Sequence, residues 1–257
     1  MQHSDYPHII LSPALADNTK LYRYISLSQF LSFVETKQSS LSRIKDWPDT
    51  WEVPEAKLPT QSDDGPLRYS LWNHHESMFG QCWSLHEESD AMWRIYSSHN
   101  EGVVIQTSVK QFRLLQDIKY GALGPVTYYD NLKMALDQIY AHPRRGEYER
   151  FTGAFLKRRA FEHEKEVRLV TEDDPDCLVR TPPHEASRFN VDLDPLEFIE
   201  GITVDPRADD RYVEMLQKYC ERARFTIKPI KSILYGNPYE QTRLVRKFVT
   251  VKKRGQE

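Results

Sequence analysis

Apolar positions recur along the chain with two periods, and each period predicts one type of element. Residues 21–25 form a short β-favouring run, and Ser26 follows with Gln29 three positions later, the pattern of a helix capping box. The apolar positions beyond it have helical spacing: Leu27, Phe30, Leu31 and Val34. This segment therefore predicts a strand that leads directly into an amphipathic helix.

Further elements follow from the same two periods. Strands are expected at residues 39–44, 81–85, 102–107, 188–191 and 198–204, with β character again at 226–235, and helices are expected from 89, from 108, at 147–162 and at 209–224. Two glycines and a proline between β-like pieces indicate a hairpin at residues 118–129. The helix at 147–162, with its aromatic stripe, is expected to be the longest.

The order of these elements predicts an α+β fold. We expect one domain at residues 19–257, with a mixed or antiparallel sheet and flanking helices, because no internal repeat or flexible linker divides the chain. Residues 1–18 carry no periodicity and are expected to form an N-terminal arm. The 257 residues are 39% hydrophobic and 12% aromatic, which is enough to bury a substantial core.

Charge and cysteine content narrow the class of protein. A net charge of -3 gives no bulk attraction for nucleic acid. The three cysteines, at 82, 177 and 220, form no C-x-x-C pair, so they indicate reduced thiols rather than a disulfide framework. Neither an apolar run of roughly 20 residues nor a basic start with an apolar block is present, so we expect a cytoplasmic protein with no membrane partner.

Common catalytic motifs are missing from the sequence. It has no G-x-x-x-x-G-K-[ST] and no G-x-G-x-x-G, so a P-loop ATPase or a Rossmann enzyme is not expected. The histidines at 74, 75 and 163 are not in an H-E-x-x-H pattern, and no metal site is expected. A G-x-S-x-G elbow is also missing, so covalent acyl chemistry has no support.

At residues 161–170 a charged run turns into an apolar, β-favouring one. In a strand, Glu164, Glu166 and Arg168 would project from one face. Two neighbouring carboxylates repel, so at least one should have a raised pKa unless a cation or a hydroxyl compensates. Such a pair can steady a developing positive charge. The alternative is a half-exposed strand whose glutamates form ion pairs with Arg168 and with Arg158 or Arg159.

These motifs together resemble a prokaryotic family known as domain of unknown function 2971. The resemblance is carried by residues 21–24, 40–42, 47–52, 92–96, 102–105, 161–169 and 199–204. One departure is the loop after the second strand, which in relatives tends to read N-D-P-x-E and here reads P-D-T-W-E at residues 48–52.

The layout is also similar to that of ADP-ribosyltransferases of the arginine-serine-glutamate type. The resemblance implies that Arg23 is the first-strand cation that holds NAD and that Ser84 is the second-strand hydroxyl. It implies an E-x-E motif at residues 164–166, with Glu166 catalytic and Glu164 positioning the acceptor or tuning Glu166. The serine triplet of that family is replaced here by W-S-L at residues 83–85.

The residue types in these implied roles suit the chemistry of NAD cleavage. Cleavage of the nicotinamide–ribose bond passes through an oxocarbenium-like state, which a carboxylate such as Glu166 stabilises. The forked donors of Arg23 suit the two phosphates of NAD. Tyr24, Trp83 or Trp93 would stack on one of its rings, although aromatic residues at helical spacing, such as Trp93, are more often core.

The resemblance implies an enzyme that consumes NAD as a substrate, either a transferase or a glycohydrolase. It implies a toxin or anti-phage defence effector with a protein or nucleic-acid acceptor and a restraining partner such as an antitoxin. The alternative is a non-enzymatic nucleic-acid or protein-binding module, which predicts a convex basic face and glutamates held in salt bridges. A third possibility is a metal-dependent nuclease that uses Asp49, Glu52 and Glu166.

Overall fold

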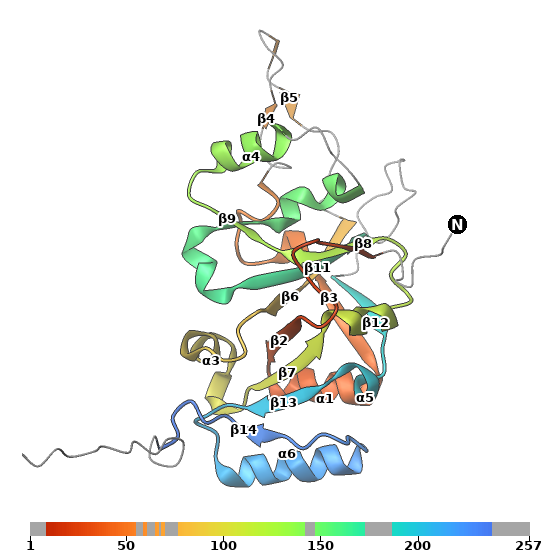
Figure 1. The fold of residues 1–257 in the computed structure, drawn as a ribbon, viewed down its shortest axis with the longest axis vertical. Helices are drawn as coiled ribbons and strands as arrows, with labels where there is room; N and C mark the ends of the chain where they lie inside the picture. Colours follow the sequence, from red (N-terminus) through yellow and green to blue (C-terminus); the bar gives the residue numbers. More distant parts are fainter. Residues whose placement is uncertain are drawn as a thin grey trace, which may run out of the picture.

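The computed structural model describes residues 9–54, 59–60, 65–66, 68–69, 77–141, 147–172 and 187–237, and the structural statements below concern these residues. They form one ten-stranded sheet, two two-stranded sheets and short helices around them (Figure 1). The main path of the large sheet runs in the order β1-β8-β11-β6-β2-β7-β13-β14, and β3 and β12 branch from β6.

The strands of the large sheet are β1 Ile9–Leu11, β2 Lys20–Ile25, β3 Gln38–Arg43, β6 Met78–Ser84, β7 Val103–Ser108, β8 Gly121–Pro125, β11 Glu166–Glu172, β12 Arg188–Asp192, β13 Gly201–Val204 and β14 Ile230–Lys231. The small sheets pair β4 Pro59–Thr60 with β5 Arg68–Tyr69, and β9 Thr127–Tyr129 with β10 Leu156–Arg158. The α-helices are α1 Leu27–Thr36, α3 Asp90–Tyr96, α4 Leu132–Ala141, α5 Pro195–Phe198 and α6 Asp210–Arg222. The 3₁₀ helices are η1 Ile44–Asp46, η3 Ser98–Asn100, η4 Val109–Leu114, η5 Glu147–Phe155 and η6 Arg159–Glu164.

The sheet forks at β6. One edge of β6 pairs along its whole length with β11. On the other edge, Ser84 pairs with Tyr22 of β2, whereas Gly80 pairs with Ser42 of β3. Two strands therefore leave the same edge of β6 at different points, and α1 joins them. This branching separates β2 from β3 beside the middle of β6.

Helix α1 fixes the geometry of the fork, and its capping box was predicted from the sequence. The Ser26 hydroxyl accepts from the Gln29 amide at 3.2 Å, and the Gln29 side chain accepts from the Ser26 amide at 2.9 Å. The helix ends at Lys37 in the left-handed region, with φ 53°, and β3 begins at the next residue. Strand β2, helix α1 and strand β3 are therefore confirmed as a continuous unit.

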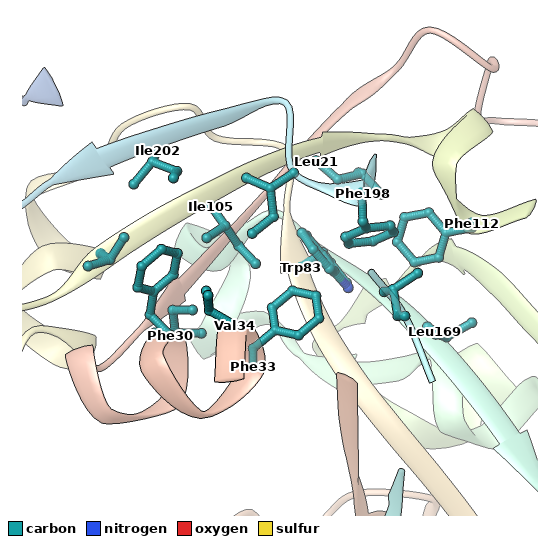
Figure 2. Close-up of a cluster of buried hydrophobic side chains, with 14 of the residues drawn as sticks. Leu21, Phe30, Phe33, Val34, Trp83, Ile105, Phe112, Leu169, Phe198 and Ile202 are labelled. Carbon is teal, nitrogen blue, oxygen red and sulfur yellow. The ribbon is translucent and has the colours of Figure 1, made fainter. Parts of the chain in front are cut away.

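The hydrophobic core lies on the face of the sheet covered by α1, α5 and η4. Figure 2 shows Trp83 of β6 among the rings of Phe112 and Phe198, whose centroids lie 5.6 and 5.8 Å from that of Trp83. Phe30 and Phe33 of α1 pack into the same cluster. Burial of large aromatic rings at contact distance makes this cluster the main stabilising element beneath the fork.

The predicted hairpin at residues 118–129 is wrong. Strand β8 pairs with β1 and β11, and β9 pairs in parallel with the distant β10. The reason is long-range packing: a Cβ at Gly121 would lie 2.8 Å from the carbonyl oxygen of Val170, so this glycine serves the close approach of β11 rather than a turn. After β8, Val126 donates its amide to the carbonyl of Glu166 at 3.0 Å.

The predicted long helix at residues 147–162 is also wrong. Two 3₁₀ helices, η5 and η6, flank the strand β10 there. Tertiary contacts override the helical periodicity, because β10 pairs with β9 and delivers the buried Lys157 to carboxylates further along the chain. Helix α6, at 13 residues, is the longest helix in the described part of the chain.

The α+β class with a mixed sheet and flanking helices is confirmed. Strand pairs β1–β8 and β13–β14 are parallel, and most others in the large sheet are antiparallel. Residues 9–11 of the predicted arm form the edge strand β1, residues 1–8 lie outside the described residues, and the division at residue 18 stays a prediction. The histidines at 74 and 75 also lie outside the described residues. Within them, no helix is long and apolar enough to span a bilayer.

Candidate functional site

A cavity of about 480 Å³ opens at the fork of the sheet. Its walls come from β2, β6, the loop at residues 47–52, α3, β10 and the turn between η6 and β11. All six residues predicted as site residues line it: Arg23, Tyr24, Trp83, Ser84, Glu164 and Glu166. Its volume lies within the roughly 300–1,000 Å³ typical of small-molecule sites.

Arg168 organises the charged wall of the cavity, and it is fully buried. Its guanidinium donates to both carboxylate oxygens of Glu52, at 2.6 and 2.9 Å, and to both oxygens of Glu166, at 2.7 and 3.2 Å. A further bond reaches the carbonyl of Ala154 at 2.5 Å, and the Trp47 ring covers the guanidinium at 4.9 Å. Arg168 therefore fixes the orientation of Glu166 through a bidentate pair.

Lys157 joins the two glutamates of the E-x-E motif. Its Nζ atom lies 2.6 Å from Oε2 of Glu164 and 2.7 Å from Oε2 of Glu166. The other carboxylate oxygen of Glu164 accepts from the hydroxyl of Tyr96 on α3 at 3.1 Å. Both glutamates are thus held by donors from different elements, and both line the cavity.

The prediction that Glu164 lies on the same strand face as Glu166 and Arg168 is wrong. Strand β11 begins at Glu166, whereas Glu164 ends η6 and Lys165 between them has a left-handed φ of 43°. Glu166 and Arg168 do share a face of β11, as predicted. The turn at Lys165 and the ammonium of Lys157 bring Glu164 to the same place by another route.

The cations determine the ionisation of Glu166. Burial disfavours its charged form, but the neighbouring charges of Arg168 and Lys157 lower the pKa of Glu166 to about 2. Burial likewise disfavours the charged form of Lys157, but the charges of Glu166 and Glu164 raise its pKa above the ordinary value. The cations expected to offset the repulsion between the two glutamates are therefore present, as Arg168 and Lys157. Glu166 is a carboxylate at neutral pH.

With all of its groups ionised, the network carries an excess of negative charge, although burial raises the pKa of Glu52 above its ordinary value. It contains three carboxylates, Glu52, Glu164 and Glu166, and two cations, Lys157 and Arg168, so the formal sum is -1. Because these groups are buried, water screens that charge weakly. This part of the cavity wall therefore attracts a positive group.

Arg23 adds a positive charge to the lining of the same cavity. It is half-buried on β2, and its guanidinium lies 5.9 Å from the centroid of the Trp83 ring. Burial lowers the pKa of Arg23 to about 10, which leaves it charged at neutral pH. Among the described residues, no carboxylate forms an ion pair with Arg23.

The remaining three predicted residues are held by protein contacts. The Ser84 hydroxyl donates to the carbonyl of Glu164 at 2.7 Å and accepts from the amide of His86 at 3.0 Å. The Tyr24 hydroxyl accepts from the Ser89 amide at 3.0 Å, and its ring packs edge-on against Trp93. Trp83 lies mainly in the core and donates to Gln81 at 2.9 Å.

Sequence reasoning missed Lys157 and Tyr96 as members of the site, and it left Glu52 and Cys82 without a structural role. Cys82 is a free cysteine whose side chain reaches the cavity beside Glu166. The thiol lies exposed in the cavity wall, where desolvation by the surrounding protein and the charge of Glu166 raise its pKa well above the ordinary value. One sequence signal would have found it: Cys82 is two residues before Ser84 on the same strand and so shares its face.

Part of the chain matches a known family model, and the fold is similar to that of solved structures. Residues 92–169 match the model of a family described as a protein of unknown function (DUF2971), so that resemblance is confirmed over this segment. No curated protein matches the chain significantly.

Three solved structures of DarT from Thermus sp. 2.9 are similar to the chain. They are a complex with NAD+ (10% identity, 85% of this chain and 97% of that chain covered, TM-score 0.40), one with carba-NAD+ (12%, 84% and 95%, 0.38) and one with ADP-ribosylated ssDNA (10%, 84% and 94%, 0.38). The likeness is distant, and it assigns no activity to this chain.

Proposed function

We propose that the cavity binds NAD as a substrate and cleaves its nicotinamide–ribose bond. The observation that carries this proposal is the pair of charges in one cavity: its lining contains Arg23, which forms no ion pair within the described residues, and the carboxylate-rich network around Glu166. NAD has the matching charges, because its pyrophosphate is anionic and its nicotinamide ring is cationic. The forked guanidinium of Arg23 binds the pyrophosphate, and the network faces the ring and its ribose.

The reaction breaks the bond between the ribose C1′ and the nicotinamide nitrogen. The electron pair leaves with nicotinamide, which becomes neutral, and the positive charge moves onto the ribose as an oxocarbenium ion. Glu166 stabilises that charge as a carboxylate, because its pKa of about 2 leaves it no proton to donate. An acceptor then forms a bond to C1′ and loses its proton.

The other residues act through Glu166 or through the shape of the cavity. Glu164, which the hydroxyl of Tyr96 holds in place, orients the acceptor. Ser84 is a positioning residue, since its hydroxyl is engaged with the backbone of the Glu164 turn. Trp83 supports the guanidinium of Arg23, and Tyr24 forms part of the wall beside it.

The acceptor decides between two activities. Water as acceptor makes the protein an NAD glycohydrolase, and a protein or nucleic acid makes it an ADP-ribosyltransferase. Both are toxic to a cell that depends on NAD or on the modified target. A toxin or anti-phage effector, restrained by a regulatory partner or antitoxin, is the biological role consistent with either activity.

A non-enzymatic binding module is the second candidate. It is favoured by one observation: Glu164 and Glu166 are engaged in ion pairs, as that reading predicted. The hypothesis also predicts a convex basic face, whereas these glutamates lie in the concave wall of a cavity. The metal-dependent nuclease is not supported, since Asp49 pairs with Arg158 and the described residues contain no cluster of three or more potential metal ligands.

The test is nicotinamide release from NAD by the purified protein, with and without cell lysate as a source of acceptors. Release in buffer alone indicates a glycohydrolase, and release that requires lysate indicates a transferase. The matched variants are Arg23→Gln, which should raise the NAD concentration needed for half-maximal rate, and Arg222→Gln on α6, which lies outside the cavity lining and should change nothing. Failure to bind or cleave NAD under both conditions would eliminate the proposal.

A further inference from the structure

A second arginine, Arg188, lies on β12 next to a strand that contributes to the cavity wall. Arg188 pairs across the sheet with Ser42 of β3, and Ser42 pairs with Gly80 of β6. Residues directly opposite one another on neighbouring strands project from the same face. Ser42 and Gly80 both line the cavity, so Arg188 extends this row by one strand, about 10 Å from Gly80 across two strand spacings.

Both arginines lack an anionic partner. Within the part of the chain that the structure describes, neither Arg188 nor Arg23 forms an ion pair, and Arg188 is exposed. The two are close enough for the charge of Arg188 to contribute to the lowered pKa of Arg23. Two like charges this close repel each other, and an anion bound to both would relieve that repulsion.

Ser42 supplies a neutral donor beside Arg188 in the cavity wall. Its hydroxyl oxygen accepts from Nε1 of Trp47 at 2.7 Å, which leaves the hydroxyl hydrogen for another acceptor. The side chain is exposed at the cavity wall. Arg188, the Ser42 hydroxyl and the cavity-lining Arg23 together offer two charged donors and one neutral donor, a set that suits the several oxygens of a phosphate group.

We propose that Arg188, Arg23 and Ser42 form a binding site for a pyrophosphate group at the fork of the sheet. This rests on the proposed function in one respect, that the pyrophosphate is the one in NAD. The arginines hold the phosphates, and the carboxylates face the ribose that reacts. Arg188 contributes to binding and has no part in bond cleavage.

The test measures the affinity of the full-length protein for inorganic pyrophosphate and for ADP-ribose by calorimetry. Arg188→Gln should weaken both by about tenfold, the effect of one charge-assisted contact. Arg188→Lys keeps the charge without the fork and should give an intermediate loss. Arg222→Gln removes an exposed arginine from α6, outside the cavity lining, and should bind like the wild type. Unfolding midpoints confirm that the variants are folded.

The outcomes separate this site from the NAD chemistry. Pyrophosphate binding that weakens in Arg188→Gln supports the site even when NAD is not cleaved, in which case only the proposed function fails. Wild-type affinities for pyrophosphate and ADP-ribose in Arg188→Gln would overturn the assignment of Arg188. A wild-type protein that binds neither ligand would overturn the site as a whole.

Discussion

Replacement of Arg168 with methionine should strongly destabilise the protein. The side chain is fully buried and makes four hydrogen bonds to two carboxylates, Glu52 and Glu166, which are themselves 4% and 3% exposed. Methionine fills much of the space but leaves both charges without this partner. Removal of one member of a buried ion pair costs about 3–5 kcal/mol. Since a domain is stable by about 5–15 kcal/mol, this is a large fraction of the total.

Urea unfolding at pH 7 measures the loss. The matched control is Arg94→Gln, because Arg94 pairs with Asp90 at 2.9 Å on the exposed surface of α3, where water screens the pair and its contribution to stability is small. The double variant Arg168→Met with Glu52→Gln removes one of the uncompensated charges and should recover part of the stability. A loss in Arg168→Met no larger than in Arg94→Gln would refute the reasoning that the network is buried and tightly coupled.

Glu166 should make the free energy of unfolding depend on pH, because its pKa falls from 4.5 to about 2 on folding. Its stabilising contribution is full above pH 4.5 and is lost as the pH falls towards 2. The stability difference between wild type and Glu166→Gln, from urea midpoints, should shrink over that window, and a constant difference would contradict the ion pairs. Gly80→Ala should cost about 1–3 kcal/mol, because the new Cβ would lie 2.8 Å from the Trp47 ring, and unchanged unfolding would disprove this contact. The Cys82 thiol should react slowly with maleimide at neutral pH and faster in Glu166→Gln, as followed by peptide mass spectrometry, and equal rates would exclude an influence of the Glu166 charge.

Elements whose ends are marked by nearby residues could be predicted from the sequence. The capping box at Ser26 and Gln29 gave the start of α1 and therefore the end of β2. The apolar run at residues 102–107 gave β7, and the N-cap at Ser89 gave α3. These signals act within a few residues, so no knowledge of the tertiary structure was needed to read them.

The ion pair of Glu166 with Arg168 was predicted as one alternative, whereas the expected pairing of the two E-x-E glutamates with Arg158 or Arg159 was wrong. The branching of the sheet and the pairing of Glu166 with Lys157 were not predictable. Lys157 lies in a segment with helical periodicity, and its burial depends on two carboxylates that reach it only after the chain turns at Lys165. Glu52 comes from a loop 116 residues before Arg168, and no local pattern joins them. The row of Arg188, Ser42 and Gly80 likewise exists only through strand register.

The most direct test of the central claim compares binding with turnover in Glu166→Gln. The account predicts that wild-type protein releases nicotinamide from NAD, and that the variant, shown to be folded, still binds ADP-ribose through the arginines but loses at least about a hundredfold in rate, the scale of one electrostatic catalytic group. Cleavage by Glu166→Gln at the wild-type rate would contradict the account, because the carboxylate nearest the proposed reaction would then have no part in it.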